Sequence, residues 1–287
     1  MSGESGPTPE FGLDAGDTLL RQCRWGPMMF NRHDSAIGRA LALYGEFAES
    51  GNALMAPFIG PGDTVIDVGA HVGTVALFLA RTVGTGGRVY AFEPQNGIFH
   101  YLCGNVALGG HRNVVCLNAA AGAESGTIEA PAVDYGAEEN FGAVSFLGQG
   151  PGETDVRTID GLNLEKCRLI KIDVEGMEPE VLKGAEETIG RLHPFVYTEN
   201  KSGDNSATVI RFFLDRDYTL YWHFAYFFRK GNFNNVDMNV FGDKGDINLV
   251  CVPPPDKSSE KATLDLPAVS GPDADWKADC TDYDDGR

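Results

Sequence analysis

The chain has 287 residues, enough for one large α/β domain with a full core or for two small domains. Its hydrophobic fraction of 43% and aromatic fraction of 10% are typical of a globular protein and exclude disorder throughout. The net charge is −18, from 23 basic and 41 acidic residues, and no stripe of Lys or Arg follows a predicted element. Binding to a phosphate backbone needs such a stripe, so we expect no nucleic-acid partner.

The cysteines and the first residues indicate the compartment. Six cysteines are scattered without a C-x-x-C pair, which fits neither a zinc site nor a disulfide framework. The N-terminus has neither the basic nor the apolar region of a signal peptide, and no window approaches the ~18 apolar residues that a membrane span requires. We therefore expect a cytoplasmic protein with reduced thiols and no transmembrane segment.

Both ends of the chain differ in composition from its middle. Residues 1–17 and 254–287 are rich in Gly, Pro and acidic side chains, so we expect both to be disordered. The expected domain spans residues 18–253. Its first part, residues 18–58, has the pattern of one strand and two helices, an N-terminal cap able to cover the open side of a core formed by residues 59–253.

In the core, predicted strands and helices alternate. The predicted strands are 64–69, 88–94, 114–120, 168–174, 194–199, 218–224 and 247–253. The predicted helices are 74–84, 96–110, 178–190 (ending at Gly190) and 206–216, and a Gly-rich interval covers residues 122–152. Parallel strands need crossover helices, whereas the last two strands are joined by a loop alone. The pattern predicts an α/β fold with a mostly parallel sheet, helices on both faces and an antiparallel hairpin at one edge.

Acidic side chains gather where the predicted strands end. In an open parallel sheet, ligands bind outside the carboxyl ends of the strands. The residues at these ends are Asp67 to His71, Glu93, Asn118, Asp173 with Glu175, and Glu199. Because such ends meet at one edge of a sheet, we expect these side chains to face a common cleft.

The first of these ends is a glycine turn, DVGAHVGT (67–74). Gly69 and Gly73 allow a tight turn and a close approach to a ligand, and the following helix start presents free N–H groups to an anion. The dinucleotide fingerprint G-x-G-x-x-G fails because its second glycine would fall at His71. The turn fits the looser acidic-x-Gly-x-x-x-Gly pattern of S-adenosylmethionine enzymes, with a purely structural turn as the alternative.

Glu93 ends the second core strand and is placed to accept hydrogen bonds from both hydroxyls of a ribose. An exposed acid before the turn at Pro94 is the structural alternative. Together with the glycine turn, Glu93 indicates an adenosine-containing ligand.

Asp173 and Glu175 could hold a substrate hydroxyl, take up its proton, or ligate a hard cation together with Glu199. Lys171 shares the strand face of Asp173 and can pair with it, so a salt bridge or helix capping is the structural alternative. His71 lies in a turn that needs no bulky ring and can face the transferred group, although a surface histidine would fit as well. We predict Asp173, Glu175 and His71 as catalytic residues; a divalent metal is not favoured.

Aromatic side chains are dense between Tyr218 and Phe233. A buried edge hairpin would explain this density, and so would a wall that binds sugar rings or apolar groups. On the second interpretation, the predicted substrate-binding residues are Glu199, Tyr221 and His223.

The sequence resembles the FkbM-type methyltransferases, a family of S-adenosylmethionine-dependent O-methyltransferases. The similarity extends from about Asp34 to Pro253, and one departure is His71, where members commonly carry Asn. The matching segments are PGDTVIDVGAHVGTVALFLA (61–80), VYAFEPQ (89–95), LNAAAG (117–122) and above all LIKIDVEGMEPEVLKGAEETI (169–189), with LALYGEF (41–47) upstream.

The resemblance implies a class I methyltransferase fold, Rossmann-like, with seven strands and the last one antiparallel. It implies S-adenosylmethionine as cofactor, with its methionine part at the glycine turn, its ribose on Glu93 and its adenine near Asn118. The predicted cofactor-binding residues are Asp67, Gly69, Ala70, His71, Gly73, Thr74, Glu93, Asn118 and Asp173.

The activity that the resemblance implies is O-methylation of a hydroxyl on a small-molecule, glycan or lipid-linked acceptor, such as a sugar or natural product. A nucleotide-cofactor oxidoreductase and a non-catalytic binding protein on the same fold are the alternatives.

Overall fold

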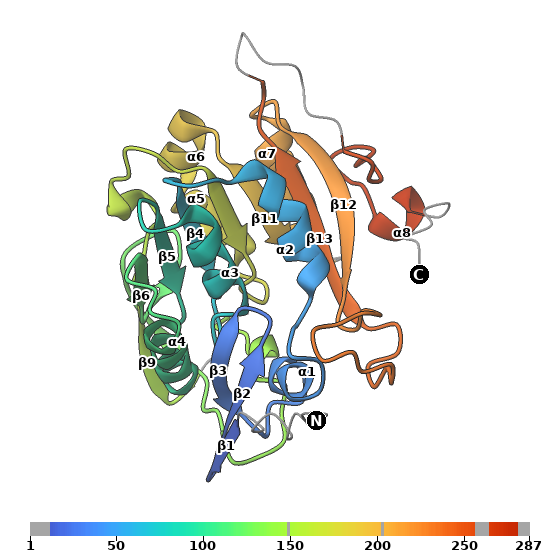
Figure 1. The fold of residues 1–287 in the computed structure, drawn as a ribbon. Coiled ribbons are helices and arrows are strands. Elements are labelled where there is room, and N and C mark those ends of the chain that lie inside the picture. The colour runs from blue at the N-terminus through green and yellow to red at the C-terminus, as the bar shows by residue number, and fades with distance from the viewer. Residues whose placement is uncertain (1–11, 148–149, 202–203, 256–263, 281–287) are drawn as a thin grey trace.

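The computed structural model describes residues 12–147, 150–201, 204–255 and 264–280. Its centre is a seven-stranded sheet in the order β12-β13-β11-β10-β4-β5-β6 (Figure 1). The strands are β4 (Thr64–Val68), β5 (Arg88–Phe92), β6 (Val114–Leu117), β10 (Leu169–Ile172), β11 (Phe195–Glu199), β12 (Thr219–Tyr226) and β13 (Gly245–Val252). Only β13 runs antiparallel to its neighbours in this sheet. The predicted α/β fold with seven mostly parallel strands and a terminal antiparallel hairpin is confirmed.

Helices cover both faces of the sheet, as predicted: α2 and α3 lie on one face and α5, α6 and α7 on the other (Figure 1). The helices of the cap and the core are α1 (Ile37–Tyr44), α2 (Glu49–Met55), α3 (Thr74–Val83), α4 (Asn96–Leu108), α5 (Glu178–Lys183), α6 (Glu186–Leu192) and α7 (Asp204–Leu214). Successive strand residues point to opposite faces. In β4, Val65 packs with Leu79 of α3, whereas Ile66 packs with Val181 of α5. The next residue, Asp67, therefore lies on the face that α3 covers.

The predicted helix 178–190 is two helices, α5 and α6. The break lies at Gly184, where a Cβ would be 1.9 Å from the carbonyl oxygen of Gly122. This contact leaves room only for glycine. The predicted end at Gly190 is also wrong, because α6 runs to Leu192 and is closed by a left-handed His193 directly before Pro194, a position where helical backbone is disfavoured.

Two small sheets lie beside the central one. In place of the single strand expected in the N-terminal cap, the structure has an antiparallel sheet of β1 (Gly12–Ala15), β2 (Thr18–Cys23) and β3 (Gly26–Asn31). The first of these strands falls within residues 1–17, so the prediction of disorder is wrong for residues 12–15. The Gly-rich interval, for which we predicted no strand, contributes to a sheet of β7 (Ala120–Ala121), β8 (Gly126–Ala130) and β9 (Gly152–Arg157). The strands β8 and β9 are short and largely exposed, so they lack the apolar runs that identify a strand in a sequence.

Part of the predicted disordered tail is ordered. Residues 264–280 pack along β12 and include the short helix α8 (Trp276–Asp279). The backbone N–H of Trp222 donates to the carbonyl oxygen of Pro267 at 2.8 Å, and its indole Nε1–H donates to Asp279 Oδ2 at 2.8 Å. These hydrogen bonds satisfy polar groups of the edge strand β12. They hold residues 264–280 against the strand although the composition of this segment is polar. The rest of the two predicted disordered ends, apart from residues 12–17 and 254–255, lies outside the described residues.

The part of the chain that the structure describes contains no helix both long and apolar enough to span a bilayer.

Candidate functional site

A cavity opens at the carboxyl ends of β4, β5 and β10. Its polar walls are formed by Gly69, His71, Glu93, Gln95, Asp173 and Glu175, and its apolar walls include Phe92, Ala119, Ala120, Ala121, Val144, Phe146 and Met177. In the register of the parallel strands, Asp67 of β4 lies opposite Lys171 of β10 on one side and opposite Ala91 of β5 on the other. Strand ends that are far apart in the sequence are thereby brought to one place, and Glu93 and Asp173 line the same cavity.

The glycine turn is pressed against the segment that follows β10. Gly69 has a φ of +78°, and a Cβ at this position would lie 1.9 Å from the carbonyl oxygen of Asp173. Gly73, which precedes α3, has a φ of +96°. Only glycine adopts such angles without strain. Between them, His71 has a left-handed φ of +49°, which is uncommon for a residue with a side chain.

Glu93 ties the glycine turn to the end of β5. The side chain is 3% exposed; Oε2 accepts the backbone N–H of His71 at 2.9 Å and Oε1 that of Gln95 at 2.8 Å. Burial raises the pKa of Glu93 to about 7, although these two hydrogen bonds lower it. A carboxylate has about four lone-pair sites, so Glu93 can accept two further hydrogen bonds from a ligand.

The side chain of Lys171 on β10 links this strand to β4 and to the residues that follow both strands. Its Nζ donates to the carbonyl oxygen of Gly69 at 3.0 Å and lies 3.5 Å from Asp67 Oδ1 and 3.4 Å from Asp173 Oδ2. Burial alone would lower the pKa of Lys171, but the charges of Asp173 and Asp67 more than offset this and raise it. Burial also raises the pKa of Asp67. The predicted ion pair of Lys171 with Asp173 is present.

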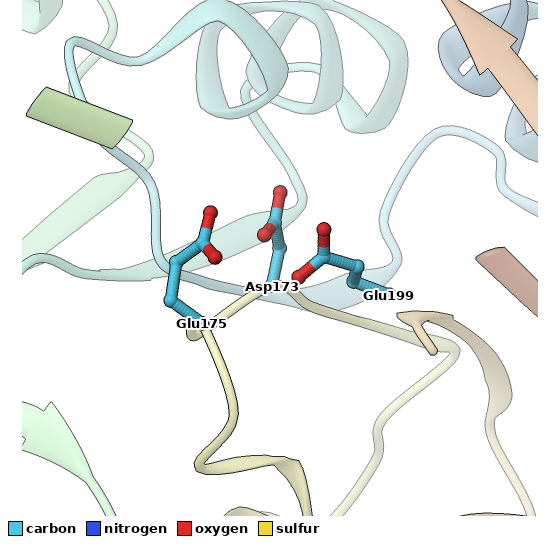
Figure 2. Close-up of side chains that lie close together, drawn as sticks. All are labelled: Asp173, Glu175 and Glu199. Atoms are coloured by element: carbon cyan, nitrogen blue, oxygen red, sulfur yellow. The ribbon is translucent and has the colours of Figure 1, made fainter. Parts of the chain in front are cut away.

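Asp173, Glu175 and Glu199 lie side by side (Figure 2), and one carboxylate oxygen of each lies within 4.8 Å of the others. This is a donor set that a hard cation could use. However, Lys201 Nζ already lies 2.5 Å from Glu175 Oε2 and 2.9 Å from Glu199 Oε1. Burial and then the negative charge of Asp173 raise the pKa of Glu199. The ammonium group of Lys201 thus occupies part of the space that a cation would need.

A second cavity adjoins the first and shares Gly69, His71 and Asp173 with it. Its lining includes three polar residues that the sequence reasoning missed: Asn52, Asp246 and Asn248. The positions of Asp246 and Asn248 could have been predicted from the sequence. They lie at the start of the antiparallel strand β13, which begins where its parallel neighbours end, and Asn248 pairs with Glu199. Asn52 lies on α2 in the cap, and its local sequence carries no comparable signal.

The other predicted residues take different positions. Ala70 and Thr74 line the second cavity. The amide Nδ2 of Asn118 donates to the carbonyl oxygens of Glu93 and Pro94, at 2.9 and 3.3 Å, and so supports the wall that the next three alanines form.

The predicted substrate residues on β12 lie behind the cavities. His223 Nδ1 is 2.8 Å from the hydroxyl of Tyr197, which lines the second cavity. Tyr221 packs in a hydrophobic cluster with Phe195 and Val250. Tyr221 and His223 point to the same face of β12, and Tyr221 lies further from the carboxyl end of the strand.

A sheet of this order, with one antiparallel strand and a glycine turn after the interior strand β4, defines the class I methyltransferase fold. The family model described as the methyltransferase FkbM domain matches residues 67–220. The chain belongs to the FkbM methyltransferase family, as its sequence resemblance predicted, and S-adenosylmethionine is the cofactor of this family.

Three methyltransferases are among the solved structures to which this chain is similar. An FkbM methyltransferase from Methylobacillus flagellatus is 18% identical (TM-score 0.48), and the match covers 67% of this chain and 44% of that one. A precorrin-6y C5,15-methyltransferase from Geobacter metallireducens is 13% identical (TM-score 0.45; 70% and 87% covered). A SAM-dependent O-methyltransferase from Thermotoga maritima is 12% identical (TM-score 0.43; 86% and 87% covered). The comparison with curated proteins gave no match.

Proposed function

We propose that this protein is an S-adenosylmethionine-dependent O-methyltransferase that methylates a hydroxyl on a sugar, natural-product or lipid-linked acceptor. The observation that carries the proposal is that Glu93, the glycine turn at Gly69, and Asp173 line one cavity. A candidate ribose-binding acid and a candidate hydroxyl-binding acid thereby line the same cavity.

The residues of the first cavity fit the cofactor. Glu93 keeps two free acceptor sites for the ribose hydroxyls, and the apolar walls at Phe92, Phe146 and the alanines after Asn118 suit an adenine ring. The start of α3 at Thr74 offers backbone N–H groups to the methionine carboxylate. In this proposal, the turn around the methionine end is shaped by four residues: Asp67, Gly69, Ala70 and Gly73.

When bound, S-adenosylmethionine supplies an electrophilic methyl group on a positively charged sulfur. Alignment of the acceptor oxygen about 3 Å from that carbon can supply much of the rate enhancement. We assign Asp173, Glu175 and His71 to binding the acceptor hydroxyl and removing its proton. Glu199 holds Glu175 in place through Lys201.

The test combines binding and transfer. Asp173→Asn and Glu175→Gln should abolish transfer of a labelled methyl group to extracts of the source cell, while calorimetry of Glu175→Gln shows unchanged affinity for S-adenosylmethionine. Glu180→Gln, at a partly exposed position on α5, is the matched control. Full activity in both variants would remove these residues from the chemistry.

The same calorimetry separates the alternatives. Preference for NAD would favour an oxidoreductase, and cofactor binding without transfer to any extract would favour a non-catalytic protein. The high net negative charge supports a protein without a nucleic-acid partner. We also propose that the protein is cytoplasmic and that residues 18–58 form a cap on the core 59–253.

A further inference from the structure

His71 lies where the two cavities meet and lines both of them. Its side chain is buried, with 6% of the residue exposed, and its Nε2 lies 3.7 Å from Asp34 Oδ2. Neither ring nitrogen has a hydrogen-bond partner among the residues that the structure describes. Leaving a buried polar group without a partner costs free energy, so such a group inside a cavity points to a role with a ligand.

Asp34 is held firmly behind this ring. It is 2% exposed, and its Oδ1 accepts the backbone N–H of Ala36 at 3.0 Å, which leaves Oδ2 directed to His71. A Cβ on Gly38 would lie 2.8 Å from the Cβ of Asp34 and 2.5 Å from the carbonyl oxygen of Asn31. The first turn of α1 can therefore approach Asp34 this closely only with glycine at position 38.

The acids in the first cavity already have cationic partners. Asp173 is paired with Lys171, and Glu175 is paired with Lys201. Each of these carboxylates is therefore engaged in an ion pair, although burial raises the pKa of Glu175. His71 has no such cation in direct contact among the described side chains.

Burial keeps His71 neutral and ready to accept a proton. The groups that face it are Asp34 from the cap, Glu93 from β5, and Lys171 and Asp173 from β10. Burial lowers the pKa of His71 below its ordinary value, although the charge of Asp34 raises it again in part. A neutral imidazole at neutral pH is the form that a general base requires.

We propose that His71 is the general base of the methyl transfer and that Asp34 is the residue that positions it, in a dyad that selects a neutral alcohol as acceptor. The proposal rests on the methyltransferase function proposed above. Their separation of 3.7 Å is longer than a hydrogen bond, and contacts of catalytic pairs often tighten when ligands bind.

The proposed step breaks two bonds and forms two. The acceptor O–H bond breaks and its proton moves to a ring nitrogen of His71, while the oxygen bonds to the methyl carbon and the carbon–sulfur electron pair stays on sulfur. The products are a methyl ether, a thioether and an imidazolium, whose charge Asp34 stabilises. An alcohol needs this proton removed because it is a poor nucleophile, whereas a neutral amine can attack before it loses a proton.

The first experiment needs no acceptor. In protein labelled with ¹⁵N-histidine, NMR follows the His71 ring, assigned by its absence in His71→Asn. Asp34→Asn should lower the pKa of His71 by about 1 unit or more, because it removes a negative charge close to the ring. Asp155→Asn, an exposed change on β9, should leave it unchanged. An unchanged His71 resonance and pKa in Asp34→Asn would overturn the positioning role.

The second experiment uses the acceptor that the labelled-methyl assay identifies. His71→Asn should lower kcat about 10²–10⁴-fold and remove the acidic limb of the pH profile. Asp34→Asn should lower kcat with little change in KM and move that limb to lower pH. His100→Asn, at an exposed position on α4, is the control.

The outcomes separate the two proposals. If Asp34→Asn does not fold, His71→Asn decides, since asparagine tolerates the left-handed backbone at position 71. Near-normal kcat with an intact acidic limb in His71→Asn would overturn the dyad and leave the methyltransferase function standing. Cofactor binding by the unmodified protein without labelled product in any extract would overturn the proposed function, and the dyad with it.

Discussion

The contact between the glycine turn and the segment after β10 makes Gly69→Ala a quantitative test of how the cavity is built. The new Cβ would lie 1.9 Å from the carbonyl oxygen of Asp173, at a φ of +78°. The left-handed backbone alone costs about 1–2 kcal/mol for a residue with a Cβ. Since the carbonyl belongs to the backbone, the turn must also move away and weaken the 3.0 Å hydrogen bond from Lys171, which costs about 1.5–3 kcal/mol. The expected loss in free energy of unfolding is about 3–5 kcal/mol.

Urea unfolding measures this loss directly, and calorimetry should show a fall in Tm of about 2–4 °C for each kcal/mol. Cofactor affinity should fall together with it, because Gly69 lines both cavities. Gly62→Ala is the matched control: Gly62 has a φ of +90°, but an added Cβ meets no atom of the described residues within 4 Å. A loss in Gly69→Ala no larger than that in Gly62→Ala would refute the close contact with Asp173.

Three further predictions concern pH, the tail and metal. The pKa of Glu93 is about 7 in the folded protein against an ordinary 4.5, so folding favours the protonated form: its contribution to stability is complete below pH 4.5 and is lost as pH rises through 7. Unfolding measured from pH 4 to 8 should show this fall, up to about 3 kcal/mol, and Glu93→Gln should lack it; an equal slope in both proteins would contradict the assignment. Asp279→Ala removes the acceptor of the Trp222 indole and should cost about 1 kcal/mol and speed proteolysis of residues 264–280; unchanged cleavage would argue against docking of the tail. Exhaustive chelation should leave methyl transfer undiminished, because Lys201 lies between two of the three clustered carboxylates, and activity restored only by Mg²⁺ would show the opposite.

The residues at the strand ends show how far local sequence determined this protein. Glu93 and Asp173 each follow a short apolar run, and parallel strands deliver their carboxyl ends to one edge, so a common cavity was predictable from the pattern. The two glycines around His71 likewise identified the turn. The alternation of strands and helices was sufficient to predict the fold class. Each element buries one face, and the spacing of its apolar residues identifies that face.

The tertiary structure alone decided which other segments reach this edge and which residues they bring. Asp34 and Asn52 come from the cap, and their neighbours in the sequence say nothing of His71 or of the second cavity. The break at Gly184 depends on a carbonyl oxygen of the distant Gly122, and the docking of the tail depends on unpaired groups of β12. In each case the stabilising free energy comes from a contact between residues far apart in the chain. The residues next to one partner in the sequence do not identify the other partner.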